Sequence, residues 1–465
     1  MRRKKEKKQC SNVLRRAGIL SAAGLLAGLC LVISPVPAFA EETAEEAAGE
    51  PAAYAEEEYS IDGLLIAKHW VIMDGRPLTD YQHPGVTFDH ATRTLILNNA
   101  NIEVDNNDFG SSLIPAIQVN SKSSADELTV RLIGESTISY KQPMIEEDCD
   151  AGLMRFHNFS KVTFTGGGTL NLDCDGNVYA GIQLIPGSYD YCGGNGLVID
   201  GCTINIDASN CQGGTREASL GIFHGIDEVE SITLNSAELN ITAQENADLA
   251  TFNGIVLRSY RVTEPQTVTV QNSRLNIVGP PNGTDSTAKG MCLWNGNLNA
   301  DHSEINIDLR GNTSATAIAC YDSGGSHIPG SGKVTVNGSE ITLQTENNDS
   351  TSAIWAEEGL TDTGNSIYMA GDTMDTLKEI SRSDLFSKYT PQLCSYSAVK
   401  ITPGSSVLKG DVNQDGVINL SDLMLCMNHA TDSITLTGDQ FTAADMDSNG
   451  DVNLSDLMAL MNQVM

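Results

Sequence analysis

The stretch ITLNSAELNI, residues 232–241, contains the pattern on which the fold of this chain depends. Leu234 lies in one short run of alternating apolar and polar residues, and Leu239 begins another after the polar corner NSA. Alternation with period two puts every second side chain on one face of a β-strand, and Asn and Ser are typical of tight turns. The stretch therefore predicts two short strands joined by a sharp bend.

The same pattern recurs along the chain at intervals of 30 to 36 residues. The strand after the corner carries Ile102, Ile138, Leu170, Ile204, Leu239, Leu275, Ile305 and Ile341. The strand before it carries Leu97, Leu132, Phe164, Ile199, Leu234, Val270 and Val336, with a copy blurred around Leu298. A further strand follows, each copy with a Gly or Ala before an expected inward anchor, at Ile117, Leu153, Ile182, Ile222, Ile255, Met291, Ile318 and Ile354.

Three short strands in each period of about 34 residues predict a mainly β protein, a parallel β-helix of about eight three-strand coils with end caps. One coil cannot bury its apolar positions, whereas coils stacked about 4.8 Å apart form a continuous core. A β-sandwich gives no such repeat, and a propeller blade needs about four strands in a longer repeat. We assign residues 59–402 to this domain, with an N-terminal cap at 59–90 and a C-terminal closure at 373–402.

The beginning of the chain has the layout of an export signal. Residues 1–40 combine a basic start, an apolar run and the small-x-small ending AFA, which predicts a signal peptide cut after Ala40 and a secreted protein. An uncleaved membrane anchor is the alternative. Residues 41–58 are acidic and Ala-rich, which favours a disordered linker over a short exposed helix. No later segment is long and apolar enough to span a bilayer.

The composition narrows the classes of partner. The net charge of −32 disfavours binding to nucleic acid or to anionic lipid and suits sites for hard cations such as Ca²⁺. The 11 cysteines show no CxxC motif and no regular spacing, which excludes a small disulfide-stapled fold. Buried free thiols are expected, and a disulfide within the region from Cys174 to Cys211 is the alternative.

Two copies of an acidic loop stand near the C-terminus, DVNQDGVINLSD at 411–422 and DMDSNGDVNLSD at 445–456. Oxygen-bearing side chains fall at loop positions one, three, five, nine and twelve, glycine is sixth, and a backbone carbonyl is available at position seven. Ca²⁺ requires six to eight oxygens arranged in this way around a tightly wound loop. The sequence therefore predicts two Ca²⁺ ions, each loop leading into a helix, with Ile418 and Val452 joining the loops by a short strand contact. The predicted ligands are Asp411, Asn413, Asp415, Val417, Asn419, Asp422, Asp445, Asp447, Asn449, Asp451, Asn453 and Asp456.

This duplicated loop and helix, with Asp rather than Glu at position twelve, resembles a dockerin module, covering residues 409–465 after a linker at 403–408. The resemblance implies docking on a cohesin domain of a scaffoldin or cell-surface protein within a cellulosome. The family's contact positions fall on identical residue pairs in the two copies, which implies docking in either of two orientations. The family often has basic residues where Met-Asn stands here. The implied cohesin contacts are Leu420, Ser421, Met427, Asn428, Leu454, Ser455, Met461 and Asn462.

The body resembles secreted bacterial proteins with a right-handed, pectate-lyase-like parallel β-helix, beginning with VTFDHATRTLILNNANI at 86–102. None of the Asn-Thr-Asp, Asp-Asp, Gly-His-Gly or Arg-Ile-Lys elements of galacturonan hydrolases occurs in the repeats, and Phe223-His224-Gly225 is the nearest approach. We expect polysaccharide binding or degradation, with non-catalytic carbohydrate binding favoured over a polysaccharide lyase or glycoside hydrolase. A surface adhesin is a second alternative, and fold alone cannot decide among them.

Counting outward from the strand anchors gathers aromatic residues on one face of the repeat stack. Flat rings pack against sugar faces, so this face is the candidate carbohydrate site. The alternatives are that a loop covers these rings or that they stack as a structural ladder. The candidate residues are Phe156, Phe223, Arg258, Trp294, Tyr321 and Trp355.

Overall fold

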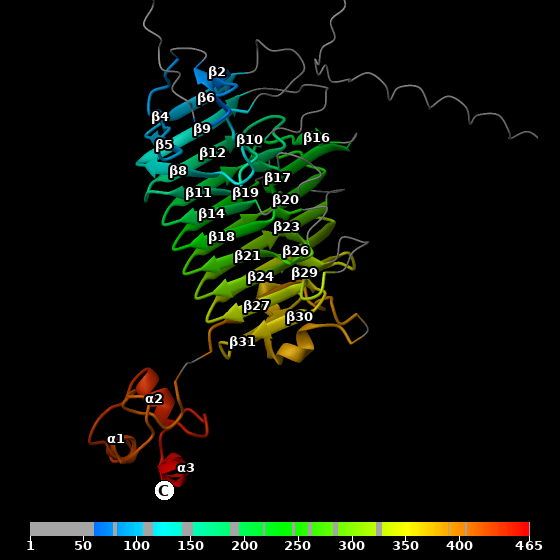
Figure 1. Ribbon diagram of the computed structural model, residues 1–465. Helices are drawn as coiled ribbons and strands as arrows, with labels where there is room; N and C mark the ends of the chain where they lie inside the picture. The colour runs from blue at the N-terminus through cyan, green and yellow to red at the C-terminus, as the bar shows by residue number, and fades with distance from the viewer. Residues whose placement is uncertain are drawn as a thin grey trace, which may run out of the picture. The chain divides into compact units, whose positions relative to one another are not determined.

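The computed structural model describes residues 60–464, apart from 78–80, 106–114, 142–151, 187–194, 217–218, 244–246, 259–262, 282–286, 322–327, 389 and 405–406. The expected signal peptide and acidic linker, residues 1–40 and 41–58, lie outside this range. Figure 1 shows stacked strands over residues 63–402 and the helices α1 to α3 over residues 420–464. Within the described part of the chain, no helix is long and apolar enough to cross a membrane.

The body is built from three sheets, A, B and C, through which the chain passes in turn (Figure 1). Sheet A contains the parallel strands β7 (Ile117–Asn120), β10 (Gly152–His157), β13 (Ala180–Ile185), β17 (Ser219–Val229), β20 (Thr251–Leu257), β23 (Thr287–Trp294), β26 (Ser314–Tyr321) and β29 (Thr351–Ala356). Sheet B contains β5 (Thr94–Asn98), β8 (Glu127–Ile133), β11 (Lys161–Thr165), β14 (Gly196–Asp200), β18 (Ser231–Asn235), β21 (Gln266–Gln271), β24 (Gly296–Asp301), β27 (Lys333–Asn337) and β30 (Gly359–Asp362). Sheet C contains β6 (Asn101–Asp105), β9 (Glu135–Lys141), β12 (Thr169–Cys174), β15 (Thr203–Asp207), β19 (Glu238–Thr242), β22 (Arg274–Val278), β25 (Glu304–Leu309) and β28 (Glu340–Thr345). The predicted stack of three-strand coils is therefore confirmed.

Antiparallel strands cover both ends of the stack, as end caps require. At the N-terminal end, β1 pairs with β7 and β4 pairs with β5. These end strands are β1 (Gly63–Ile66), β2 (His69–Met73), β3 (Arg76–Pro77) and β4 (Val86–Asp89). The C-terminal closure contains β31 (Ile367–Gly371), the 3-10 turns Met374–Thr376 and Arg382–Leu385, β32 (Lys378–Ile380) and β33 (Ala398–Thr402), while β16 (Gly214–Arg216) pairs with β17.

The pairing register confirms most of the repeat and corrects several positions. From Leu170 onward the sheet C anchors pair coil to coil, for example Ile204 with Leu239. Ile138 pairs with Leu172 rather than Leu170, a two-residue slip that keeps both side chains inward because the strand period is two. In sheet B, the anchor Val270 pairs with Ala300. Ala300, rather than Leu298, is therefore the inward anchor of the next coil.

Two of the expected sheet A anchors are wrong. Met154, not Leu153, pairs with Ile117, and Ile226, not Ile222, pairs with Ile182 and Ile255. An irregularity between Ile226 and Val229 lengthens β17, and the sequence pattern did not show it. These shifts change which neighbouring side chains face outward.

A column of small residues runs along sheet A just before the true anchors. Gly225, Gly254 and Gly290 lie in successive coils, and a Cβ added to Gly254 would come within 2.6 Å of the Gly290 carbonyl oxygen. The same Cβ would lie 2.7 Å from Cγ2 of Ile277 on sheet C. Glycine is therefore needed here because backbone and core approach each other closely.

We expect Gly254→Ala to lower the free energy of unfolding of the body by about 1–3 kcal/mol, because the added methyl overpacks a closed site. Denaturant unfolding of the whole chain measures the effect. Gly196→Ala is the matched control, since its added Cβ would lie 3.0 Å from the Ser231 hydroxyl oxygen, the end of a side chain that can rotate away, and no closer than 4.0 Å to Cγ of Lys161 or the Ser160 carbonyl oxygen. Equal midpoints of denaturant unfolding for the two variants would contradict the claim that close packing requires glycine in this column.

The cysteines are buried free thiols, as the sequence favoured. Seven are free and buried among the described residues, and Cys10, Cys30, Cys149 and Cys192 lie outside them. Burial raises the pKa of Cys211 to about 12 and the pKa of Cys174 well above its usual value. These thiols are part of the apolar core and stay protonated at neutral pH.

The C-terminal region forms a small helical module with its own core. Its helices are α1 (Leu420–Ala430), α2 (Asp439–Ala444) and α3 (Leu454–Val464). The core consists of Val412, Cys426, Leu436, Ala443, Ala444, Val452 and Leu460. The expected strand contact between Ile418 and Val452 is absent from the described residues 407–464, and both side chains belong to this hydrophobic cluster instead.

Candidate metal centres and docking face

The first acidic loop is wound around its own carboxylates. Asp411 is 6% exposed and accepts hydrogen bonds from the backbone N–H groups of Asp415 at 3.1 Å and Gly416 at 2.8 Å. Asp422 is fully buried and accepts from the backbone of Asn413 and of Asn419, both at 2.9 Å. Gly416 has a φ of 84°, a left-handed conformation that favours glycine at the sharp turn of the loop.

The second loop repeats this geometry with its own residues. Asp445 accepts from the backbone of Asn449 at 3.1 Å and of Gly450 at 3.0 Å. Asp456 is fully buried and accepts from Met446 at 2.8 Å and from Asn453 at 2.9 Å. The two loops are therefore equivalent in conformation as well as in sequence.

The donor set of the loops fits calcium. Carboxylate oxygens of Asp445, Asp447 and Asp456 all lie within 4.8 Å of one another. Asn413 stands in the first loop where Asp447 stands in the second, and Asp415 stands where Asn449 does, so each loop sequence offers three carboxylates beside neutral oxygens, although among the described residues only those of the second loop lie this close together. Hard divalent cations prefer an all-oxygen set of this kind, and neither predicted set contains a histidine or a cysteine.

The remaining predicted ligands lie on the same loops. Asn419 caps α1 and accepts from Ser421, and Asn453 accepts from Ser455 at the start of the second helix, each at 2.8 Å. Val417 has no side-chain donor, so it would serve the metal through its backbone carbonyl, and Asp451 holds the equivalent loop position.

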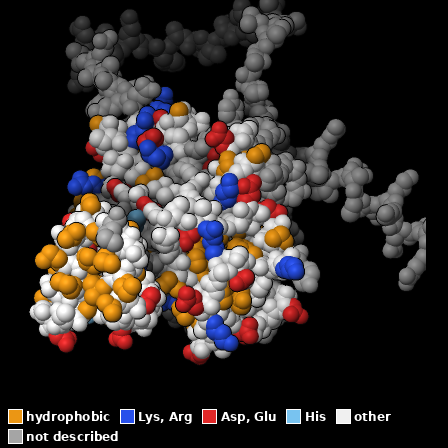
Figure 2. All heavy atoms as spheres, turned by 90° about the horizontal axis from the view of Figure 1, so that it is seen from below, with side chains coloured by type: hydrophobic (Ala, Val, Ile, Leu, Met, Phe, Trp, Pro, Cys, Tyr) orange, Lys and Arg blue, Asp and Glu red, His pale blue; other side chains and the backbone are white. Residues whose placement is uncertain are grey.

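Each helix carries an outward apolar stripe. Leu420, Met424 and Met427 are 66%, 54% and 47% exposed, at the i, i+4, i+7 spacing of one helix face. The equivalent residues of the second helix, Leu454, Met458 and Met461, are 70%, 56% and 39% exposed. Figure 2 shows hydrophobic side chains gathered in one such patch on the surface toward the viewer.

The predicted cohesin contacts lie on or beside these stripes. Leu420, Ser421 and Met427 are exposed on the first helix, and Leu454, Ser455, Met461 and Asn462 are exposed on the second, while Asn428 is half-buried. The sequence reasoning missed Met424 and Met458, which fill the middle of each stripe. The helical spacing of apolar residues in LSDLMLCMNHA and LSDLMALMNQV was the signal that could have found them.

Paired oxygen-lined loops, each leading into a helix with an exposed apolar stripe, are features of a calcium-binding docking module. Residues 409–465 match the family described as Dockerin type I domain. Comparison with curated proteins and with solved structures returned no match. A dockerin type I domain binds calcium and implies docking on a cohesin and association with an extracellular cellulosome.

In the body, the outward residues of sheet C repeat from coil to coil. Asn171, Asn205, Asn240, Asn276 and Asn306 form a ladder in which each side-chain amide donates to the preceding coil, at 2.6 to 3.1 Å. Such a ladder supports the stack itself.

The outward residues of sheet A change between most coils and form no continuous ladder of one residue type over the described strands. One outward row contains His224, Asn253 and Lys289, which pair in register. The connections that follow the strands of this sheet also vary in length. The connection after β17 is Glu230 alone, whereas the connection after β13 comprises residues 186–195. Loss of repetition on one face of a repeat protein, beside variable connections, marks that face as the functional candidate.

An aromatic cluster lies on this face. Trp355 is 40% exposed and stacks on Tyr321, with ring centroids 5.4 Å apart and planes 29° apart. Tyr321 accepts a hydrogen bond from the indole of Trp294 at 2.8 Å and from the Lys289 ammonium at 3.2 Å. The structure therefore brings Trp294, Tyr321 and Trp355 together.

Two of the predicted aromatic residues face the core instead. Phe156 is 1% exposed because it pairs with the inward Val119, and Phe223 is fully buried against Phe252, with centroids 6.2 Å apart. The wrong anchors Leu153 and Ile222 misplaced them. The expectation that these two rings face outward is thus corrected.

Arg258 belongs to a buried polar cluster rather than to an open surface. Its Nη2 lies 3.0 and 2.7 Å from the two carboxylate oxygens of Asp227 and donates to the Tyr179 hydroxyl at 3.1 Å. His224 lies 4.0 Å from Asp227 and 3.0 Å from the Asn253 amide. In Phe223-His224-Gly225, the ring of the first residue is therefore in the core, and the imidazole of the second is engaged within this cluster.

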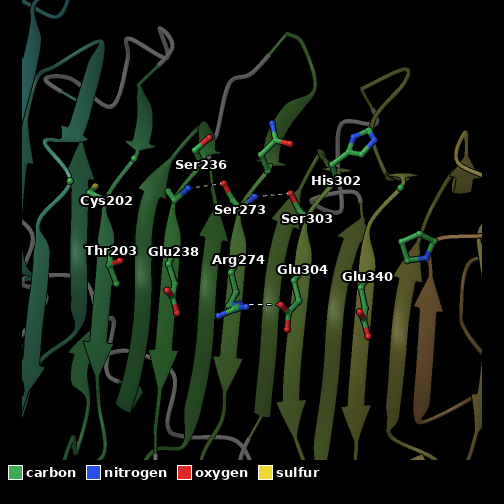
Figure 3. A pocket seen from close by; sticks show the side chains of 16 residues that line it. Cys202, Thr203, Ser236, Glu238, Ser273, Arg274, His302, Ser303, Glu304 and Glu340 are labelled. Atoms are coloured by element: carbon green, nitrogen blue, oxygen red, sulfur yellow. Dashed lines mark hydrogen bonds and ion pairs between the residues drawn. The ribbon is translucent and has the colours of Figure 1, made fainter. Parts of the chain in front are cut away.

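A shallow groove runs along the corner between sheets B and C (Figure 3). Its backbone is held by a serine ladder, in which Ser273 accepts from the Ala237 N–H at 3.0 Å and Ser303 accepts from the Ser273 N–H at 3.1 Å. Beside the ladder, at the residues that follow these two serines, Arg274 pairs with Glu304 at 3.0 Å. The serine hydroxyls thus accept hydrogen bonds from backbone N–H groups at the tight corners of successive coils. The groove is therefore a consequence of the turn that the chain makes between sheets B and C in each coil.

Proposed function

We propose that residues 409–465 form a domain that binds two Ca²⁺ ions and docks this chain on a cohesin through the outward faces of α1 and α3. The observation that carries this proposal is the matched pair of apolar stripes, each placed by a loop of the same conformation. The predicted contact residues are the ones named on the two helices, with Met424 and Met458 added. Since the two stripes are chemically alike, the module docks in either of two orientations.

Calcium titration and cohesin binding test this proposal on the whole chain. We expect two calcium ions to bind, and excess chelator to abolish binding to a cohesin domain, because the loops lose the charge that holds their carboxylates together. Variants of either helix alone, such as Leu420→Ala or Leu454→Ala, should retain binding, whereas the combined variant should lose it. Undiminished binding in chelator would refute the calcium requirement.

For the body we propose carbohydrate binding on the outer face of sheet A, with polysaccharide as the ligand class and secretion as the setting. The specific support is the exposed ring of Trp355 lying over Tyr321, a flat apolar surface with the Glu357 carboxylate 3.2 Å from the indole nitrogen. Degradation by a lyase or glycoside hydrolase and adhesion to host glycans remain the competing proposals. Turnover of any substrate in a polysaccharide panel would favour the first competitor.

Trp355→Ala is expected to weaken retention on a polysaccharide affinity gel by at least about tenfold, since covering a large apolar side chain contributes about 1.5–3 kcal/mol and about 1.4 kcal/mol corresponds to tenfold in affinity. Val278→Ala is the matched control, because Val278 is a 38% exposed apolar residue of sheet C. If both variants bind the gel as the unchanged protein does, the proposed face is wrong.

A further inference from the structure

The two docking helices are unusual in carrying no Lys, Arg or Glu. Over residues 420–430 and 454–464 the only carboxylates are Asp422 and Asp456, and both are fully buried against their loops. The exposed side chains of the two helices are Leu, Met, Ser, Asn, Ala and Gln. The face that these helices present is therefore apolar and without charge.

Large apolar side chains are concentrated on this face and are exposed to solvent. Six large side chains, Leu420, Met424, Met427, Leu454, Met458 and Met461, are each at least 39% exposed. A contiguous exposed apolar patch on a soluble domain marks an interaction surface. Exposed acidic residues such as Asp415, Asp447 and Asp451 lie instead on the loops.

We propose that the partner surface is itself apolar and makes no charged contact with this face, an inference that rests on the proposed docking to a cohesin. A charged partner side chain brought against these stripes would lose its water and gain no counter-charge, which is costly. The acidic loops additionally oppose an acidic partner. Association therefore depends on buried apolar area rather than on charge complementarity.

Methionine suits this surface for a second reason. Its unbranched thioether side chain has three rotatable bonds and adapts to irregular partner surfaces. The two stripes differ slightly in exposure, with Met427 at 47% and Met461 at 39%. Flexible side chains let both stripes accept the same partner surface.

The test uses the whole calcium-loaded chain and the cohesin domain that it binds most tightly in a panel of purified cohesins. We expect the dissociation constant to change by less than about threefold between about 0.05 and about 1 M sodium chloride, because salt screens charge pairs but leaves apolar contacts intact. A tenfold weakening over that range would overturn the inference while leaving cohesin docking in place.

Substitutions at the centre of the stripes provide the second measurement. Met424→Lys together with Met458→Lys should weaken cohesin binding at least about 30-fold, as expected for a charge placed in a buried hot spot. Met424→Leu with Met458→Leu is the matched control and should bind like the unchanged chain. Full binding by the double lysine variant would overturn the inference.

Two other outcomes distinguish a failure of this inference from a failure of the proposed docking to a cohesin. If no cohesin in the panel binds at any salt concentration, the proposed docking function itself fails. If the chain alone forms dimers in sedimentation experiments, and the double lysine variant is monomeric, the occupant of the face is a second copy of this chain. That result would overturn the assignment to an apolar cohesin surface.

Discussion

Replacing Asp456 by alanine is expected to unfold the C-terminal module in the presence of calcium and to abolish cohesin docking. Asp456 is fully buried, and its carboxylate accepts backbone hydrogen bonds from Met446 at 2.8 Å, Asp447 at 3.2 Å and Asn453 at 2.9 Å. A hydrogen bond to a charged group contributes about 1.5–3 kcal/mol, so losing three of them removes at least about 4 kcal/mol. A domain of this size has little more than that to lose, because small cores contribute few kcal/mol.

Far-ultraviolet circular dichroism of the whole chain measures this effect directly. All α-helices among the described residues lie between Leu420 and Val464, so the helical signal reports on this module. Asp439→Asn is the matched control, since Asp439 is an exposed carboxylate at the start of α2 and outside both loops. A helical signal in Asp456→Ala that still rises when calcium is added would show that the carboxylate is dispensable.

Replacing Asp227 by alanine is expected to destabilise the body by about 3–5 kcal/mol, because the change leaves the buried charge of Arg258 without its partner. Asp227 is fully buried and Arg258 is 13% exposed, with 2.7 Å between their closest nitrogen and oxygen. The pair of Asp308 and Arg310 is the matched control, since its side chains are 32% and 59% exposed. Asp308→Ala should cost less than about 1 kcal/mol, as exposed ion pairs do.

Scanning calorimetry of the whole chain distinguishes these two carboxylates through the transition of the body. A double variant, Asp227→Ala with Arg258→Met, should recover part of the lost stability because it removes both buried charges. Equal transition temperatures for Asp227→Ala and Asp308→Ala would mean that the buried cluster does not stabilise the fold.

The same cluster gives the body a defined acid dependence. Burial alone would raise the pKa of Asp227, but the charges of His224 and Arg258, with the Tyr179 hydrogen bond, lower it below its usual range. A carboxyl whose folded pKa is lowered stabilises the fold above its unfolded pKa of about 3.9 and loses that contribution as the pH falls through the folded value. Below about pH 4, the stability difference between the unchanged protein and Asp227→Asn should therefore shrink.

The sequence determined the architecture because its signals are local and repeated. The period-two pattern around Leu234 and Leu239 recurs in every coil, so each copy independently predicts the same pair of strands. The two calcium loops could also be predicted from the sequence. In residues 411–422 and 445–456, the position of a residue within the loop by itself decides whether its oxygen can serve as a ligand. Contacts between neighbouring residues are encoded in the order of the residues themselves.

The tertiary structure decided which side chains face the core and which distant residues come together, because both depend on the register between coils. Phe156 is in the core because Met154 is the true anchor, and Phe223 is in the core because it pairs with the buried Phe252; only the pairing of adjacent coils fixes these positions. The cluster of Asp227, Arg258 and Tyr179 joins residues 31 and 79 positions apart, which no local pattern reveals. A shift of one residue reverses the direction of every side chain in a strand, so the local sequence determined the strands and the stacking of coils determined which side chains face outward.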